Sequence, residues 1–221
     1  MTRGSAPRKS RTRAGTASAD LLDAAERLMG ERGYAATPVS MISQEAGVAI
    51  TSLYWHFGSK EGLLARLMER GANRWFDALP RWEDLGGAPD ERVAAMLRGV
   101  ADAMAQHPIF LRLFYMLALE AAEDEAASEI VGRVRRRAFE LFHAAISQML
   151  AADDHDVVDE AAWDLARFAV AYSDGCFFAG QLESTDTDLH AMYADLGLAL
   201  AALAPGVIER LRRRRAGRPL T

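Results

Sequence analysis

A short segment bounded by two glycines constrains the fold more than any other part of this sequence. Residues 51–57 lie between Gly47 and Gly58, and Leu53 and Phe57 stand four residues apart, as on one face of a helix. A helix of about seven residues is not stable alone in water, so neighbouring helices must hold it in place. The sequence therefore predicts a short helix whose supporting elements lie close by in the chain.

The preceding residues supply such a support. Thr37 can cap the start of a helix, and Pro38 suits its first position because a proline there loses no hydrogen bond. This helix should run to about Ala46, and Gly47 can then take the positive φ that a tight turn requires. We expect the short helix to pack on Ile42, Ala46 and Val48. Two short helices around a glycine turn form a helix-turn-helix.

The composition favours helix over the rest of the chain. Half of the 221 residues are apolar, β-branched residues are sparse, and no region shows a sustained period of two. We therefore predict an all-α fold. Besides the two short helices, helices are expected at about residues 18–32, 60–78, 90–106, 109–122, 126–151, 159–182 and 188–214.

Charge is unevenly divided along the chain. The formal net charge is −5, but residues 1–77 carry 11 Lys and Arg against 8 Asp and Glu, and the remainder carries 15 against 23. Only the N-terminal part suits a polyanion such as nucleic acid. Residues 1–17 are predicted to be a disordered basic arm, which either contacts phosphates or the minor groove or is a solvated tail without a role. Its basic residues are Arg3, Arg8, Lys9, Arg11 and Arg13.

Several classes of protein are disfavoured. The single cysteine, Cys176, excludes an internal disulfide and indicates a reducing compartment. Because no signal-peptide pattern and no run of about 18 apolar residues occurs, we expect a cytoplasmic protein that does not span a membrane. No catalytic motif is present, and the acidic residues around His155 are better explained as a solvated joint than as a metal site. We expect no enzyme activity, no cofactor and no metal.

The most specific segment is residues 33–64, GYAATPVSMISQEAGVAITSLYWHFGSKEGLL. It resembles the DNA-binding domain of the TetR family of bacterial transcriptional regulators. The matching residues are Gly33, Tyr34, Thr37, Ile42, Ala46, Gly47, Val48, Leu53, Tyr54, His56, Phe57, Lys60, Glu61, Leu63 and Leu64. Two residues depart from the family: Ala49 stands where Ser or Thr is common, and Ile50 where a basic or small polar residue is frequent. The second helix of the motif should therefore lack a side-chain cap, and no operator sequence is predicted.

The resemblance implies which residues contact DNA. Tyr54, His56 and Lys60 would contact phosphates, while Thr51, Ser52 and Trp55 lie where base edges or thymine methyl groups are met. Thr37 and Ser40 would add phosphate contacts. The alternative for Tyr54 and Trp55 is that they are core aromatic residues.

The rest of the chain resembles the family only in architecture. The resemblance implies a division into the basic arm, a helix-turn-helix DNA-binding domain at 18–60, a helical effector-binding and dimerisation domain at 61–214, and a tail at 215–221. It also implies that the last two helices form a four-helix dimer interface. The expected interface residues, which could instead be ordinary core, are Phe168, Tyr172, Gly175, Phe178, Ala179, Leu196, Leu200 and Leu203.

An effector pocket is expected among the remaining helices, lined by aromatic and adaptable apolar side chains. Its candidate residues are Trp75, Met104, Phe110, Phe114, Tyr115, Phe139, Phe142, His143 and Tyr172. Among them, His143 and Tyr172 would provide polar selectivity, whereas any one of the set could simply be core.

The predicted function is that of a ligand-responsive repressor. A homodimer would bind a palindromic double-stranded DNA operator and be released by a small apolar or aromatic effector. A TetR-like activator or a co-repressor-dependent regulator is the alternative. A DNA-packaging protein would share the basic N-terminal part but would not need an aromatic-rich second domain.

Overall fold

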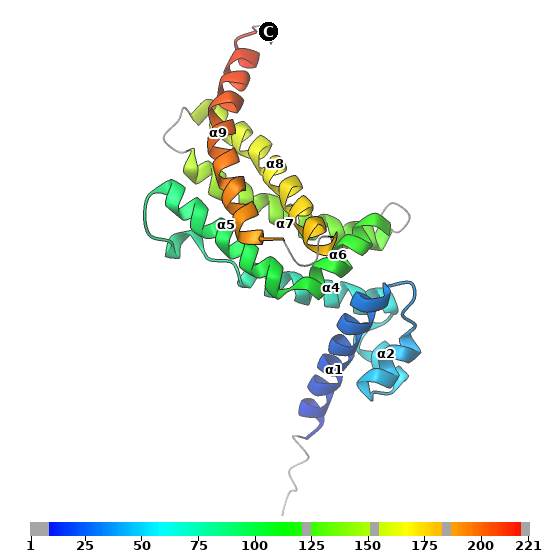
Figure 1. Cartoon of the computed structure of the whole chain (residues 1–221). Coiled ribbons are helices and arrows are strands. Elements are labelled where there is room, and N and C mark those ends of the chain that lie inside the picture. Colours follow the sequence, from blue (N-terminus) through cyan, green and yellow to red (C-terminus); the bar gives the residue numbers. More distant parts are fainter. Residues whose placement is uncertain (1–8, 121–124, 151–154, 183–186, 218–221) are drawn as a thin grey trace, which may run out of the picture. The chain divides into compact units, whose positions relative to one another are not determined.

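The computed structural model describes residues 9–120, 125–150, 155–182 and 187–217, and these form helices joined by short connections (Figure 1). No strand occurs among the residues so described, so the predicted all-α class is confirmed. The elements are α1 (Lys9–Arg32), α2 (Val39–Ala46), α3 (Ile50–Phe57), α4 (Lys60–Asp77), the 3₁₀ helix η1 (Trp82–Asp84), α5 (Pro89–Gln106), α6 (Pro108–Glu120), α7 (Glu125–Met149), α8 (His155–Leu182) and α9 (Leu189–Arg215).

The first helix begins earlier than predicted. Because α1 starts at Lys9, residues 9–17 of the predicted disordered arm are helical, and that part of the prediction is wrong. Lys, Arg and Ala are good helix formers, and extending an existing helix costs far less than starting a new one. The rest of the arm, residues 1–8, lies outside the described residues.

The chain folds as two compact units. Unit 1 comprises residues up to Arg74 together with 108–131, and unit 2 comprises residues 75–107 and the chain from Gly132 onward. Unit 1 therefore contains α6 as well as α1, α2 and α3, although α6 lies far along the chain from the others. The predicted division of functions at residue 60 stays a prediction.

Helix α1 is the centre of unit 1, where it contacts α2, α3 and α6. Leu21, Ala25 and Met29 form its fully buried face at helical spacing. Helix α4 is tied to α1 by Arg70, whose guanidinium lies 2.7 Å from the Asp23 carboxylate and 2.5 Å from that of Glu26.

Two glycines let α6 approach its neighbours closely. A Cβ on Gly30 in α1 would lie 2.5 Å from Cγ2 of Ile109, and a Cβ on Gly71 in α4 would overlap the ring of Phe110. Both glycines are buried. The side chains at the start of α6 are therefore packed against the backbones of α1 and α4.

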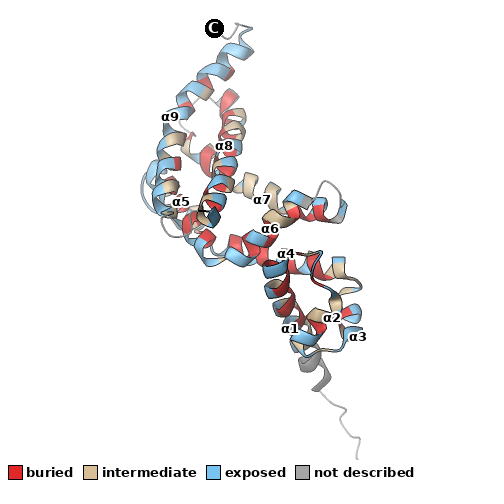
Figure 2. Cartoon of the chain, turned by 45° about the vertical axis from the view of Figure 1, so that its right-hand side comes forward, coloured by how far each residue is buried: buried red, intermediate tan, exposed pale blue. Residues whose placement is uncertain are grey.

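In unit 2, α8 and α9 run antiparallel and side by side, and α5 packs on α9 (Figure 1). One face of α9 is buried while its other side is exposed (Figure 2). The buried residues, at spacings of three and four, are Tyr193, Leu196, Leu200, Ala204, Ile208 and Leu211. Leu196 and Leu200, predicted at a dimer interface, are thus core residues of the chain itself, because they lie on the face that α5 and α8 cover.

Helix α9 is also, among the described residues, the helix that is long and apolar enough to cross a membrane by length and composition. As expected, the sequence of α9 holds no uninterrupted run of about 18 apolar residues, but its abundant Ala and Leu raise the average hydropathy despite isolated polar residues. The same composition suits a helix that packs on two sides.

Candidate nucleic-acid interface

The turn between α2 and α3 has the geometry of a helix-turn-helix. Gly47 ends α2 with φ of 63°, the left-handed conformation predicted for it, and the Val48 amide donates to the Ser43 carbonyl at 3.0 Å. Ala49 precedes α3 without a side-chain hydrogen bond, which confirms the predicted lack of a cap. Leu53 and Ile42 are fully buried, so α3 is held through its inner face.

The outer face of α3 carries large exposed side chains. Trp55 is 77% exposed and Tyr54 is 50% exposed, so neither is a core aromatic residue. Thr51 and Ile50 are exposed beside them at the start of the helix. The ring of Trp55 meets His56 edge-on, with 4.7 Å between ring centroids. This face offers hydroxyl, indole and aliphatic groups to a partner.

Thr37 does not belong to that face. Its side chain is fully buried, and its hydroxyl donates to the Gly33 carbonyl at 2.8 Å, with the Leu28 carbonyl 3.3 Å away. Pro38, rather than Thr37, occupies the position before α2. The predicted phosphate contact and helix cap by Thr37 are both wrong, because the hydroxyl instead satisfies carbonyls at the C-terminal end of α1. Ser40, in the first turn of α2, is exposed.

Lys60 is partly engaged inside unit 1. Its ammonium donates to the Tyr34 carbonyl at 2.7 Å and lies 4.2 Å from the centroid of the Tyr34 ring. Partial burial lowers the pKa of Lys60, while the charge of Glu61 acts in the opposite direction. Lys60 therefore holds the segment after α1 against the start of α4, and some of its donor capacity is already used.

Glu61 completes this junction. The Tyr34 hydroxyl donates to the Glu61 carboxylate at 3.1 Å. The Ser59 hydroxyl accepts from the Gly62 amide at 3.0 Å and so caps the start of α4. Hydrogen bonds from Ser59, from the Glu61 backbone and from Tyr34 lower the pKa of the Glu61 carboxyl. Tyr34 was noted in the sequence only as a matching residue, and its role as a link between α1 and α4 emerges from the structure.

Residues 21–67 match the model of a family described as bacterial regulatory proteins, tetR family. The match runs from the buried face of α1 through α2 and α3 into α4, and so covers the whole helix-turn-helix. These residues therefore form a helix-turn-helix domain of the TetR family. Members of this family are DNA-binding transcriptional regulators and not enzymes, so the expectation of no enzyme activity is confirmed.

Curated relatives are TetR-family regulators. The chain is 26% identical to the HTH-type transcriptional regulator BetI of Rhizobium meliloti over 79% of this chain and 82% of BetI. It is 35% identical to the HTH-type transcriptional repressor KstR2 of Mycobacterium tuberculosis over 40% of this chain and 44% of KstR2.

Solved structures share the fold over most of its length. A TetR-family transcriptional regulator from Rhodococcus sp. has a TM-score of 0.66 at 18% identity and covers 86% of this chain and 99% of its own. A transcriptional regulator from Saccharomonospora viridis, solved in complex with choline, has a TM-score of 0.66 at 19% identity and covers 82% of this chain and 94% of its own.

The residues predicted to bind an effector are divided between the two units. Phe110, Phe114 and Tyr115 belong to α6 in unit 1, where Phe110 packs on Gly71. The other candidates lie in unit 2, where Trp75, Met104 and Phe142 are buried. Phe139 and Tyr172 are half-buried, with the Arg135 guanidinium 5.5 Å from the Phe139 ring and the Phe168 ring 6.3 Å from that of Tyr172.

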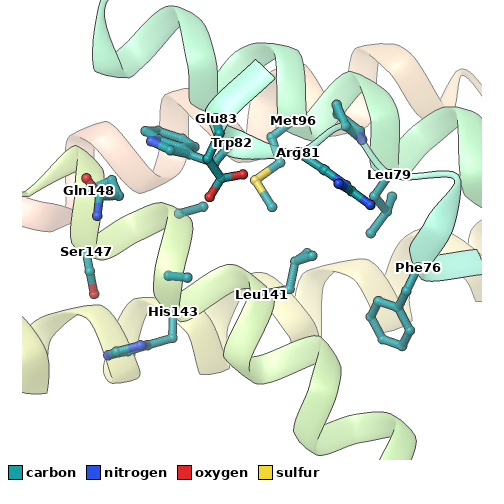
Figure 3. Close-up of a pocket in the computed structure, with 13 residues that line it drawn as sticks. Phe76, Leu79, Arg81, Trp82, Glu83, Met96, Leu141, His143, Ser147 and Gln148 are labelled. Carbon is teal, nitrogen blue, oxygen red and sulfur yellow. The ribbon is translucent and has the colours of Figure 1, made fainter. Parts of the chain in front are cut away.

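Unit 2 contains an open cleft of about 510 Å³ (Figure 3). Its walls are the chain from Phe76 to Glu83, Met96 of α5, and the part of α7 from Leu141 to Gln148. Of the predicted effector residues, only His143 lines this cleft. The sequence signal that could have identified this cleft is an aromatic residue, Trp82, within the Pro- and Gly-rich connection between α4 and α5.

His143 turns its ring away from the cleft (Figure 3). The ring stacks on Trp163 with 4.3 Å between centroids, and Nε2 lies 2.9 Å from the Asp159 carboxylate. Both partners belong to α8, so His143 holds α7 against α8. Its predicted role in polar selectivity is not supported by this orientation.

The remaining predicted interface residues lie on the surface of unit 2 in the single chain. Phe168, Gly175 and Phe178 of α8 are exposed, as is Leu203 of α9. Tyr172 and Ala179 are half-buried between them. Leu198 was not predicted and is 71% exposed, so both helices present apolar side chains to their surroundings.

Proposed function

We propose that this TetR-family regulator is a dimeric repressor that binds a palindromic operator through α3 and is released by a small effector bound in unit 2. The observation that carries the proposal is the contrast on α3 between the fully buried Leu53 and the exposed Tyr54 and Trp55. A helix held by its inner face with such side chains outside suits insertion into a major groove.

The α3 face divides into two kinds of contact. Tyr54 and His56 would hydrogen-bond phosphates, which positions the protein without reading sequence. Thr51, Ser52 and Trp55 would meet base edges, and the exposed Ile50 adds an apolar contact for thymine methyl groups. Ser40 on α2, and the partly engaged Lys60, would supply further phosphate contacts.

Dimerisation would place two copies of α3 on one face of DNA. Exposed Phe168, Phe178 and Leu198 on α8 and α9 are apolar groups that a second copy could cover around a two-fold axis. Two such copies would occupy successive major grooves roughly 34 Å apart on a palindromic site. This use of α9 also accounts for its apolar composition without a membrane.

An effector would act through α4, which continues from unit 1 into unit 2. An effector that binds one conformation of unit 2 more tightly shifts the population toward it. If that conformation sets the two copies of α3 too far apart, the operator is released. Redox control by Cys176 is not favoured, because the thiol is buried and burial raises its pKa to about 11. A regulator of promoters would work in the bacterial cytoplasm.

The α3 assignment is tested by DNA-binding titrations at one moderate salt concentration, with fragments selected by the wild-type protein. Trp55→Ala should lose about 1–3 kcal/mol of binding free energy and relax the sequence preference at one position. Tyr54→Ala should weaken binding to all fragments alike. Leu119→Ala is a matched control, because Leu119 is an exposed apolar residue of α6 in the same unit.

Wild-type affinity in both α3 variants would remove this face from the DNA interface. Affinity that depends only on salt, with no preferred sequence, would favour a DNA-packaging protein instead. A motif that is bound only after a small molecule is added would favour the co-repressor-dependent alternative.

The dimer is tested by sedimentation at micromolar concentration without DNA or detergent. Leu198→Glu should give a folded monomer. Leu198 is exposed in the single chain, so the charge of the new glutamate would be buried only between two copies. Leu119→Glu serves as the control and should remain dimeric. A monomeric wild-type protein would contradict the proposal.

A further inference from the structure

We propose that the cleft of unit 2 binds an amphipathic anion, an apolar chain that ends in a carboxylate, with Arg81 as the partner of the carboxylate. This inference rests on the proposed effector response, and it names the chemical class of the effector.

The size and walls of the cleft suit an apolar chain. Its volume of about 510 Å³ falls within the range of roughly 300–1,000 Å³ found for small-molecule sites. Phe76, Leu79, Met96 and Leu141 line it, and the flexible thioether of Met96 can adjust to an unbranched chain. Figure 3 shows Met96 and Leu141 approaching from opposite walls.

Two guanidinium groups lie beside this cleft in addition to the one that lines it. Arg81 and Glu83 line it, and two further guanidinium groups lie beside lining residues, Arg92 at 5.8 Å from the Trp82 ring and Arg137 at 4.2 Å from the Phe76 ring. The lining Arg81 and Glu83 offset each other, so the two guanidinium groups beside the lining rings favour an anionic ligand over a cationic one.

The aromatic rings are not arranged as a cage for a cation. A quaternary ammonium group is recognised by the open faces of aromatic rings. Here the rings of Trp82 and Phe76 each already have a guanidinium group over them. A ligand with a positive headgroup would compete with these arginines and be repelled by them.

The polar end of the ligand is assigned to the connection between α4 and α5. On the opposite wall, the ring of His143 is directed toward Asp159 and Trp163 of α8. On the near wall, Arg81 is exposed at the surface and extends along the cleft (Figure 3). An arginine fork matches a carboxylate in two parallel hydrogen bonds. Pro80 fixes the position of this segment because it lies against Gly99 of α5, where a Cβ would not fit.

The test is calorimetric titration of the full chain with three ligands that share one alkyl chain: decanoate, decan-1-ol and decyltrimethylammonium, below their micellar concentrations. Decanoate should bind most tightly. Arg81→Gln should weaken decanoate binding by about tenfold to a hundredfold, the usual effect of losing a hydrogen bond to a charged group. It should leave the affinity for decan-1-ol unchanged.

Arg98→Gln is the matched control, because Arg98 is an exposed arginine of α5 that does not line the cleft. Its affinity for decanoate should equal that of the wild type. Trp82→Phe provides a local readout, because it should abolish the change in tryptophan fluorescence that decanoate causes. Circular dichroism of each variant checks that the fold is kept.

Three results would overturn the inference: equal binding of decanoate and decan-1-ol, tighter binding of decyltrimethylammonium, or wild-type binding of decanoate by Arg81→Gln. Failure of all three ligands to bind would overturn it as well. Because these titrations contain no DNA, they leave the operator-binding proposal standing. That proposal fails separately if the same preparation selects no DNA sequence.

Discussion

The outward face of α3 and the cleft of unit 2 are built in different ways. Eight consecutive residues form α3, and the burial of Leu53 determines which of the others face outward. The cleft instead combines the connection after α4, Met96 of α5 and the C-terminal half of α7. A surface on one short helix follows from local periodicity, whereas a cleft made by distant stretches depends on how they pack.

The largest expected effect tests whether α3 depends on a single buried side chain. Leu53→Ala should destabilise unit 1 by about 2–5 kcal/mol, the usual result of emptying a fully buried leucine site. Thermal unfolding followed by circular dichroism measures the change. Tyr54→Ala, one residue along the same helix, is the control and should change stability by less than about 0.5 kcal/mol because its side chain is exposed. Equal losses in both variants would break the distinction between the two faces of α3.

A pair of glycine variants compares close packing in unit 1 with open helix surface in unit 2. Gly71→Ala should cost about 1–3 kcal/mol, because the new methyl group overlaps Phe110. Gly132→Ala in α7 should instead stabilise by about 0.5–1 kcal/mol, since nothing lies near its Cβ position and alanine favours helix. Chemical denaturation gives both values. The same sign in both variants would contradict the close approach of α6 to α4.

Thr37→Val separates a structural residue from the DNA-binding set. Replacing the buried hydroxyl by a methyl group leaves the Gly33 carbonyl without this donor and should cost about 1 kcal/mol of stability. DNA affinity of the folded variant should equal that of the wild type. Ser40→Ala is expected to show the reverse pattern, with unchanged stability and weaker DNA binding. A loss of affinity in Thr37→Val at full stability would restore Thr37 to the DNA interface.

The smallest expected effect is pH-dependent. The pKa of Glu61 is lowered in the folded state, so its carboxylate adds stability at neutral pH, and this contribution is lost as pH falls through that lowered value. Unfolding temperatures of the wild type and Glu61→Gln should therefore differ at neutral pH and converge in acid. A difference that stays constant over this range would show that the hydrogen bonds to Tyr34 and Ser59 do not depend on the charge.

These contrasts explain what the sequence could predict. The glycine turn, the uncapped start of α3 and the buried Leu53 follow from local rules, so they could be predicted and agree with the structure. Thr37 could not be assigned correctly from the sequence. A threonine before a proline can either cap the following helix or donate, while buried, to carbonyls of the preceding helix. Only the packing of the chain distinguishes the two.

Prediction was poorest where one helix has two faces that are both apolar. In α9, Leu196 and Leu198 are two residues apart and equally hydrophobic, yet one is fully buried and the other exposed. Which side meets α5 and α8 is a tertiary property. Likewise, the aromatic residues of α6 were predicted in an effector pocket, but the close approach at Gly71 places Phe110 in the packing of unit 1.

The most direct test of the central claim is selection of bound fragments from random and genomic DNA by the purified protein, at one stated moderate salt concentration, followed by sequencing. We predict an enriched palindrome near promoters, with half-sites about one helical turn apart, and the same motif with relaxed preference at one position in Trp55→Ala. Bound fragments that share no motif, with an amount of bound DNA that depends only on salt concentration, would contradict sequence-specific operator binding.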